Sequence, residues 1–284
     1  EEAHWAGELQ RAGALLLRSG YITASLLDRL PDLKVIAVHG VGVDPVDVAA
    51  CTERGVLVTN TPGANADAVT EITFGLMLSL LRQIPDAAHK TKVDRAWDSA
   101  RHTGSELKGR ILGLIGLGQI GQRVARIASA FGMGVIAHDP ALDDAEITRR
   151  GAEPMTFEGV LASADILSLH APAIPATRHM INAETIAGMK STAMIVNCAR
   201  GCLIDESALA QALMDGRLGG AALDVLEGEP PDPESPIYEA PNLILTPHMA
   251  GSTRECLRTI AGTAGADMVR VLSGEAPKHP VNKV

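Results

Sequence analysis

The sequence predicts an α/β fold of two domains, in which helices cover parallel sheets. Short runs of β-branched and other apolar residues alternate with longer stretches of helical periodicity, a pattern typical of parallel sheets. The 284 residues are more than one core fills at roughly 100–200 residues per domain. Hydrophobic residues make up 46% of the chain and charged residues 21%, which is the balance of a folded protein.

The first hundred residues contain three short apolar runs and several helical stretches. The predicted strands are Ala14–Arg18, Val35–His39 and Val56–Thr59. The predicted helices are Ala24–Leu30, Val46–Arg54, a long one from about Ala66 to Arg82 and, beyond the break at Pro85, one that reaches about Ala96.

The rest of the chain repeats the alternation around a glycine-rich turn. Its predicted strands are Arg110–Ile115, Val135–His138, Ile166–Leu169, Met194–Asn197, Ala221–Val225 and Leu243–Leu245. Its predicted helices include one that ends near Phe131, Glu206–Asp215 with Asp205 as N-cap, and a last one from about Thr253 to Leu272.

Charge and composition exclude several functional classes. The net charge of −9 and the low aromatic content of 2% argue against nucleic acid as the main partner. The longest apolar run, Phe74–Leu81, is too short for a membrane span, so no membrane partner is expected. Four scattered cysteines favour a reducing cytoplasm over a disulfide scaffold. The chain begins at Glu1 without Met, and we expect its N-terminal domain to be incomplete.

Three glycines directly after the strand Arg110–Ile115 predict a dinucleotide site. Gly116 permits a tight turn, Gly118 lets the backbone approach a pyrophosphate, and Gly121 lets helix and strand pack closely. The helix that begins there offers N–H groups and a positive dipole to phosphates. The alternative is a glycine-rich turn that binds nothing.

Asp139 ends the next strand at the spacing expected for a carboxylate that binds the adenosine ribose. A carboxylate there repels a 2′-phosphate, and the following Pro140–Leu142 contains no Arg to hold one. The predicted cofactor is therefore NAD rather than NADP. The alternative is that Asp139 is a solvated turn residue.

Three polar residues follow strands whose carboxyl ends meet at one edge of the sheet: Arg200, Glu229 and His248. Reduction of a ketone by hydride needs a proton donor, and the ordinary pKa of His suits His248 to that task. Glu229 can orient the imidazolium, and the Arg200 fork matches a carboxylate. From the pattern alone Glu227 is as good a partner as Glu229. No metal ligand set is predicted.

A series of short motifs runs through the whole sequence in a fixed order: Gly40–Asp44, Asn60–Gly63, Arg82–Pro85, Trp97, Gly104–Gly109, Gly116–Gly121, Asn197–Gly201, Ala221–Val225, Glu229–Pro230, Thr246–Thr253 and Pro280–Asn282. In these motifs the chain resembles the D-isomer-specific 2-hydroxyacid dehydrogenase family, and it is similar over nearly its whole length to the phosphoglycerate dehydrogenase branch.

The resemblance implies a role for each catalytic residue and a set of cofactor contacts. It makes His248 the acid/base, Glu229 its partner, Glu227 a solvated neighbour, and Arg200 the anchor of the substrate carboxylate and carbonyl. The implied cofactor-binding residues are Gly116, Gly118, Gln119, Ile120, Gly121, Asp139, Ala171, Pro172, Cys198, Ala199, Arg200, Asp224, His248, Ala250 and Gly251. A redox role for the Cys198 thiol is the weaker interpretation, because hydride transfer needs no thiolate.

The family's architecture implies two domains. A Rossmann-type NAD domain, residues 99–253, is expected beside a discontinuous flavodoxin-like substrate domain of residues 1–98 and 254–284, with the cleft closing before hydride transfer. A homodimer built around the cofactor domains is also expected.

The resemblance also implies how the substrate is held, but it leaves the substrate itself open. Backbone amides of Val41 and Gly42 are implied to bind its carboxylate, and Arg18 a distal phosphate. Val38 stands where the phosphoglycerate branch usually has Arg, so glyoxylate, hydroxypyruvate and sulfolactate remain alternatives to 3-phosphoglycerate. A separate possibility is an NADH-sensing corepressor, since some relatives have that role.

Overall fold

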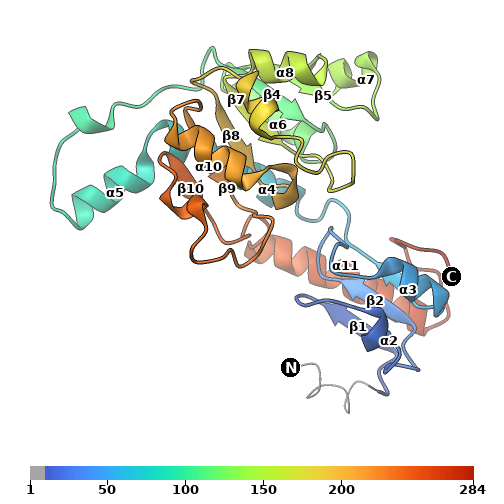
Figure 1. Cartoon of the computed structure of the whole chain (residues 1–284). Helices are drawn as coiled ribbons and strands as arrows, with labels where there is room; N and C mark the ends of the chain where they lie inside the picture. The colour runs from blue at the N-terminus through green and yellow to red at the C-terminus, as the bar shows by residue number, and fades with distance from the viewer. Residues whose placement is uncertain (1–9) are drawn as a thin grey trace. The chain divides into compact units, whose positions relative to one another are not determined.

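The computed structural model describes residues 10–284, which form two compact units (Figure 1). The first unit contains residues 10–65 together with Gly251–Val284, and the second contains Ala66–Ala250. Residues 66–98 therefore group with the second unit. The predicted assignment of residues 1–98 to a substrate domain stays a prediction.

The first unit is built on a parallel sheet of three strands in the order β1-β2-β3, as the apolar runs predicted. The strands are β1 (Ala14–Leu17), β2 (Val35–Val38) and β3 (Leu57–Thr59). The helices are α2 (Ala24–Leu27), α3 (Val48–Glu53) and α11 (Arg254–Leu272). All four residues of β2 are buried, because the strand lies in the middle and α11 packs against it.

The end of the chain is tied to this sheet. Asn282 accepts the N–H of Val58 through Oδ1 at 2.7 Å, and its Nδ2 donates to Val56 O at 2.9 Å. Since 224 residues separate Asn282 from Val58, these bonds explain how the two ends of the sequence build one unit.

The second unit is built on a parallel sheet of seven strands in the order β10-β9-β8-β7-β4-β5-β6. The strands are β4 (Ile111–Ile115), β5 (Gly134–His138), β6 (Glu153–Pro154), β7 (Ile166–Leu169), β8 (Met194–Asn197), β9 (Gly220–Leu223) and β10 (Leu243–Leu245). Only the two-residue β6 lacked a predicted counterpart. Strands β7, β8 and β9 are buried along nearly their whole length, which matches their continuous apolar sequences.

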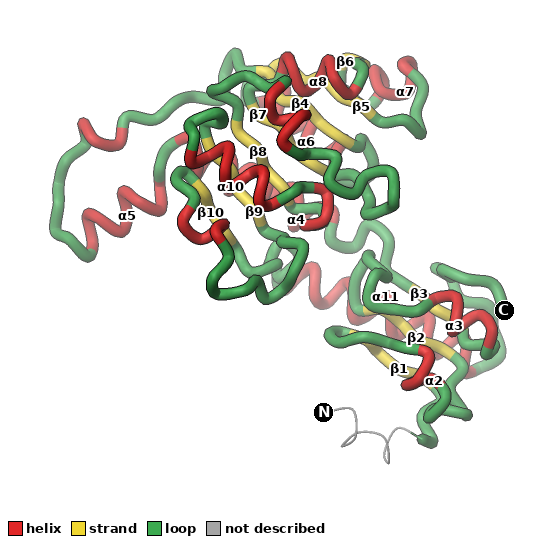
Figure 2. Tube along the Cα trace, in the orientation of Figure 1, coloured by secondary structure: helices red, strands yellow, loops and turns green. Residues whose placement is uncertain are grey.

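The second unit also contains helices, most of which cover its sheet, whereas the helix at Ile84–Lys92 stands out from it (Figure 2). They are α4 (Ala66–Leu81), α5 (Ile84–Lys92), α6 (Gly121–Ala130), α7 (Asp144–Arg149), α8 (Phe157–Ser163), α9 (Ala183–Ala187) and α10 (Glu206–Met214), with single 3₁₀ turns at Ala100–His102, Gly201–Leu203 and Pro236–Glu239. The prediction of Asp205 as N-cap of α10 is confirmed, since its carboxylate accepts the Ala208 N–H at 3.0 Å. No described helix is long and apolar enough to cross a membrane.

The strand order creates a place for a ligand. Chain order runs outward in opposite directions on the two sides of the neighbouring strands β4 and β7. Loops that leave the carboxyl ends of such a pair diverge, and the crevice between them is the usual ligand site of an open α/β sheet. The glycine turn after β4 and the segment after β7 flank this point.

Candidate active site

The glycine turn after β4 is shaped by close backbone contacts. Gly116 has φ +90°, and a Cβ at that position would lie 2.7 Å from the carbonyl oxygen of His170, just after β7. A Cβ on Gly121 would overlap the carbonyl oxygen of Gly116, whereas one on Gly118 would meet no atom within 4 Å. Gly116 and Gly121 therefore pack the turn, and Gly118 leaves its backbone accessible.

Asp139 at the end of β5 is bonded to this turn. Its Oδ2 accepts the Leu117 N–H at 2.8 Å, and its Oδ1 accepts the Ala141 N–H at 3.0 Å. A carboxylate oxygen can accept more than one hydrogen bond, so both oxygens keep capacity for a ribose hydroxyl.

His248 and Glu229 form a hydrogen-bonded pair. The distance from Nδ1 of His248 to Oε2 of Glu229 is 2.6 Å, and Oε1 of Glu229 accepts the Leu226 N–H at 3.0 Å. Because an ionised carboxylate can only accept, Nδ1 of His248 donates, and Nε2 is the ring nitrogen left to exchange a proton with a substrate.

Electrostatics favours the charged form of both partners. The hydrogen bond to Glu229 raises the pKa of His248. The negative charges of Glu229 and Asp224 also raise this pKa, whereas burial and the positive charge of Arg200 lower it, and the net shift is upward. Burial acts to raise the pKa of Glu229, but the bonds from His248 and Leu226 and the charges of His248 and Arg200 lower it below its ordinary value. A protonated imidazolium is thus held next to an ionised carboxylate.

A buried carboxylate fixes the turn that carries His248. Asp224, 1% exposed, directly follows β9 and accepts hydrogen bonds from Thr246 Oγ1 at 2.6 Å and from the N–H groups of Met249 and Ala250 at 2.9 and 2.8 Å. His248 itself has φ +50°, a conformation that favours glycine. These bonds hold it there, so Asp224 positions the imidazole as well as being a predicted cofactor contact.

The loop after β8 positions Arg200. Asn197 is fully buried, accepts the Ala199 N–H at 3.0 Å and donates to Arg200 O at 2.8 Å. A Cβ on Gly201 would overlap the backbone of Leu226, so glycine lets this loop lie against the loop that carries Glu229. Arg200 is close enough for its charge to lower the pKa of both Glu229 and His248.

The structure also connects residues that the sequence pattern did not single out. Glu227, expected as a solvated neighbour, is exposed and forms ion pairs with Arg178 and with His179, whose Nε2 lies 2.7 Å from Oε2. The N–H of Glu227 donates to Oε1 of Glu206, at the start of α10. Glu206 directly follows Asp205, the predicted N-cap of α10. The sequence therefore already placed Glu206 near the carboxyl ends of the strands, and this position could have marked it as a candidate site residue.

The remaining predicted residues fall into two sets. Ala171 and Pro172 follow β7, and Cys198 and Ala199 follow β8, at the carboxyl edge of the second sheet. Burial raises the pKa of Cys198 to about 12, which leaves the thiol protonated and argues against a thiolate role. The residues Arg18, Val41, Gly42 and Gly251 belong to the first unit.

The first-unit loops nonetheless have features of an anion site. Arg18 is exposed directly after β1, and the loop after β2 is held by Asn60 Nδ2, which donates to Val41 O at 2.7 Å. Among the residues that the structure describes, none accepts a hydrogen bond from the N–H of Val41 or Gly42.

Comparison with known proteins decides the family. Residues 74–250 match the model of the D-isomer specific 2-hydroxyacid dehydrogenase NAD binding domain. The chain belongs to this family. It is 45% identical over 278 residues to a D-3-phosphoglycerate dehydrogenase of Methanocaldococcus jannaschii, covering 97% of this chain but 52% of that protein. It is 40% identical to a glyoxylate reductase of Thermofilum pendens, covering 95% of this chain and 80% of the relative.

A solved structure, the TT0316 protein of Thermus thermophilus, aligns with a TM-score of 0.92 and 37% identity, over 99% of this chain and 89% of that one. The chain spans about half the length of the first-named curated relative. The cofactor of the matched domain is NAD, and the residues present fit it. The glycine turn leaves Gly118 accessible, and Asp139 adjoins that turn with a free acceptor capacity.

Proposed function

We propose that this family member interconverts a small 2-hydroxy acid and its 2-oxo acid by hydride transfer with NAD. The observation that carries the proposal is the 2.6 Å hydrogen bond between His248 and Glu229, at the carboxyl edge of a sheet with a glycine turn for NAD. An acid/base held protonated by an ionised partner is what carbonyl reduction requires.

The glycine turn after β4 and Asp139 would hold NADH, which would supply the hydride to the carbonyl carbon in the direction of reduction. Nε2 of His248 gives its proton to the oxygen, and Glu229 stabilises the imidazolium before transfer and keeps the ring oriented. Arg200 binds the substrate carboxylate and polarises the carbonyl with its fixed positive charge. In the reverse direction neutral His248 accepts the hydroxyl proton.

Loss of NADH absorbance in the presence of 2-oxo acids tests this function. We expect turnover with at least one small 2-oxo acid, and a fall of about 10²–10⁴-fold in kcat for His248→Ala, the usual contribution of a general acid. NADH binding should change little in that variant. Intact NADH binding without turnover on a broad panel would instead support the NADH-sensing role.

Phosphoglycerate dehydrogenase-like activity is the proposed specificity. The relatives of that name support it, as do the exposed Arg18 and the amides of Val41 and Gly42, which donate to no residue within 10–284, since they offer positive charge and donors to a doubly anionic acid. Val38 at a position where that branch has Arg, and the similarity to a glyoxylate reductase, keep glyoxylate, hydroxypyruvate and sulfolactate in the panel.

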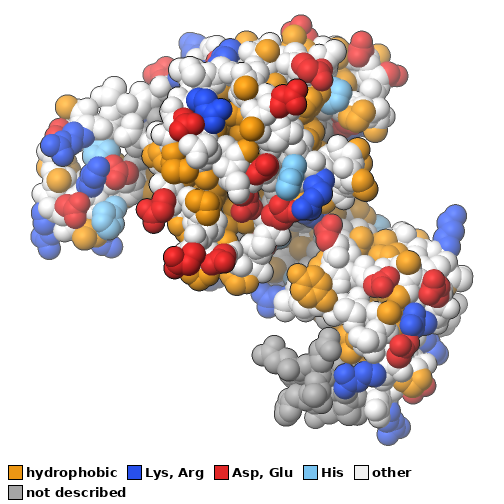
Figure 3. Space-filling view, in the orientation of Figure 1, with side chains coloured by type: hydrophobic (Ala, Val, Ile, Leu, Met, Phe, Trp, Pro, Cys, Tyr) orange, Lys and Arg blue, Asp and Glu red, His pale blue; other side chains and the backbone are white. Residues whose placement is uncertain are grey.

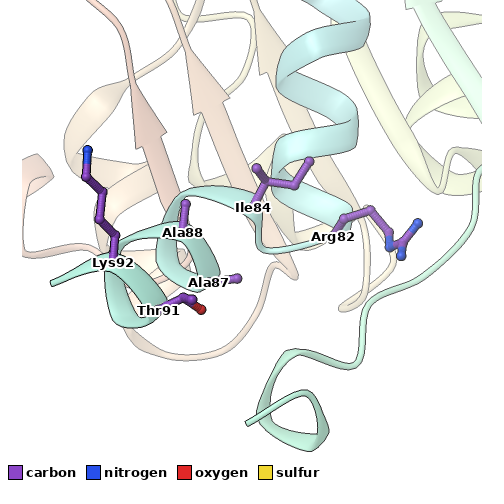
Figure 4. A pocket seen from close by; sticks show the side chains of 6 residues that line it. All are labelled: Arg82, Ile84, Ala87, Ala88, Thr91 and Lys92. Carbon is purple, nitrogen blue, oxygen red and sulfur yellow. The ribbon is translucent and has the colours of Figure 1, made fainter. Parts of the chain in front are cut away.

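We further propose that two copies of the chain associate through α5 and the segment after it. No residue of α5 is buried, and Ile84, Val93 and Trp97 are 48%, 60% and 92% exposed. Figure 1 shows this segment standing out from the second sheet. A hollow of about 640 Å³ on it is lined by Arg82, Ile84, Ala87, Ala88, Thr91 and Lys92 (Figure 4).

A second copy fits this surface better than a partner of one charge. Acidic and basic side chains alternate along it, including the pairs Lys90–Asp86 and Arg101–Asp98, and Figure 3 shows both signs on this part of the molecule. Such a surface can be complementary to itself in a two-fold dimer. Sedimentation should give twice the chain's 29.7 kDa, and Trp97→Glu should give monomer while Tyr238→Glu, also at an exposed aromatic, does not. A monomeric wild type contradicts the proposal.

The proposed compartment is the cytoplasm. Support comes from the cysteines, since all four are free and Cys51, Cys198 and Cys256 are buried. Proteins of oxidising compartments commonly pair their cysteines in disulfides, whereas free thiols are typical of the reducing cytoplasm.

A further inference from the structure

A hollow of about 650 Å³ that is rich in arginine includes two arginines that contact the glycine turn. We call it the arginine hollow, and it is lined by Asp67, Gln122, Arg123, Arg126, Ser129, Arg149, Arg150 and Gly151. Its four guanidinium groups stand out in a chain with a net charge of −9. The proposed chemistry of the active site uses none of them.

Two of these arginines make the same pair of contacts. Arg123 donates through Nε to Asp67 Oδ1 at 2.8 Å and through Nη1 to Gln119 O at 2.6 Å. Arg150 donates through Nε to Glu146 Oε1 at 2.6 Å and through Nη1 to Leu117 O at 2.7 Å. Each guanidinium therefore links a helix carboxylate to a carbonyl of the glycine turn.

These contacts also determine the direction of N–H groups on the other side of the turn. In a trans peptide the C=O of one residue and the N–H of the next point in opposite directions. With Leu117 O and Gln119 O held toward the arginine hollow, the N–H groups of Gly118 and Ile120 point away from it. Within residues 10–284, no residue accepts a hydrogen bond from either N–H. Two donors are thus left for a ligand at the N-terminal end of α6, where dinucleotide folds bind the pyrophosphate.

We propose that Arg123 and Arg150 are positioning residues for the cofactor, which fix the peptide planes of Leu117 and Gln119 from behind and so aim the Gly118 and Ile120 N–H groups at the diphosphate. The inference rests on the proposed use of NAD and adds a device that the glycine pattern does not contain. Both side chains are partly exposed, at 31% for Arg123 and 22% for Arg150, so their removal leaves no large cavity in the core.

The carboxylate partners keep the two guanidinium groups in place. Hydrogen bonds from Arg149 and Arg150 lower the pKa of Glu146 to about 2, so it stays ionised at every pH of interest. Arg149 uses Nε and Nη2 for Glu146, and Arg126 is exposed without a hydrogen bond or ion pair among the described residues. These two arginines share the hollow but do not touch the turn, which makes them matched controls.

The test measures the affinity for NADH by fluorescence titration and calorimetry in four single variants. Arg123→Ala and Arg150→Ala should each weaken NADH binding about fivefold to tenfold, the value of about one ordinary hydrogen bond. Arg126→Ala and Arg149→Ala remove the same charge from the hollow and should change it by less than about twofold. Equal losses in all four variants would show that only the electrostatic field matters and would overturn the proposal.

Two further measurements separate positioning from folding. ADP-ribose should lose affinity as NADH does, while AMP, which lacks the diphosphate, should not, and kcat at saturating NADH should stay near wild type while KM for NADH rises. Arg123→Lys keeps the charge but cannot reach both acceptors with one nitrogen, so it should restore only part of the affinity. A lowered Tm with unchanged NADH affinity would assign the arginines to structure alone. Failure of the wild type to bind NADH would reject the proposed function itself.

Discussion

Nδ1 of His248 lies 2.6 Å from Oε2 of Glu229, and this hydrogen bond raises the pKa of the imidazole. The two residues come from loops after different strands, β10 and β9, so the sheet brings together groups 19 residues apart. The bond also determines which nitrogen faces the substrate. Glu229 thereby sets both the orientation and the protonation of His248.

Glu229→Gln should move the pH profile of reduction toward lower pH. Reduction needs protonated His248, so kcat/KM falls as pH rises through the pKa of that residue. Because the carboxylate raises this pKa, its replacement by a neutral amide lowers it, and the descending limb shifts to lower pH. Oxidation needs neutral His248, so its ascending limb should shift in the same direction. Profiles that coincide with the wild type would separate Glu229 from the proton transfer.

Gly201→Ala should damage the site through backbone sterics. The added Cβ would overlap the backbone carbon and oxygen of Leu226, so the Arg200 and Glu229 loops must move apart. Displacement of catalytic groups by about 1 Å can cost about 100-fold in rate. Gly228→Ala is the matched control, since its Cβ would meet no atom within 4 Å. Equal activity of the two variants would contradict the importance of this contact.

The sequence predicted most of the fold because its signals were local. Continuous apolar runs marked the buried strands, and Asp205 marked the start of α10. Helix α5 ends at Lys92 rather than near Ala96, and Arg95 has φ +59°, a conformation through which a right-handed helix cannot continue. The contacts of Arg123 and Arg150 with the glycine turn could not be predicted from the sequence. Arg150, for example, lies 33 residues from Leu117, and only the tertiary structure brings the two together.

Sequence reasoning chose the catalytic residues from strand ends but missed what holds them. Asn197 and Asp224 end or follow buried strands, and only the structure shows that their side chains bond to the loops of Arg200 and His248. Glu227 looked equivalent to Glu229 in the pattern. Its partners, Arg178 and His179, come from a loop that no periodicity connects to it.

Two substitutions of Asp139 should show whether its negative charge or its hydrogen bond to the glycine turn determines the preference for NADH over NADPH. Asp139→Asn keeps an oxygen for the Leu117 N–H but removes the negative charge, so the preference for NADH over NADPH should weaken while NADH still binds. Asp139→Ala also loses the acceptor and should weaken both cofactors. The ratio of kcat/KM for the two cofactors measures the effect. A preference that is the same in both variants as in the wild type would remove Asp139 from the ribose site.

Arg18→Ala should discriminate between doubly and singly anionic substrates. If Arg18 binds a distal phosphate, kcat/KM for 3-phosphohydroxypyruvate should fall about 10–100-fold, the value of a charge-assisted hydrogen bond of about 1.5–3 kcal/mol, while glyoxylate should change little. The control is Arg11→Ala, which removes the same charge from an exposed position in the same unit. Equal losses for the two substrates would mean that Arg18 acts on the fold or on the general field, and the distal-anion pocket would have to be sought elsewhere. A selective loss would place the specificity for phosphorylated acids in the first unit, apart from the chemistry of His248 in the second.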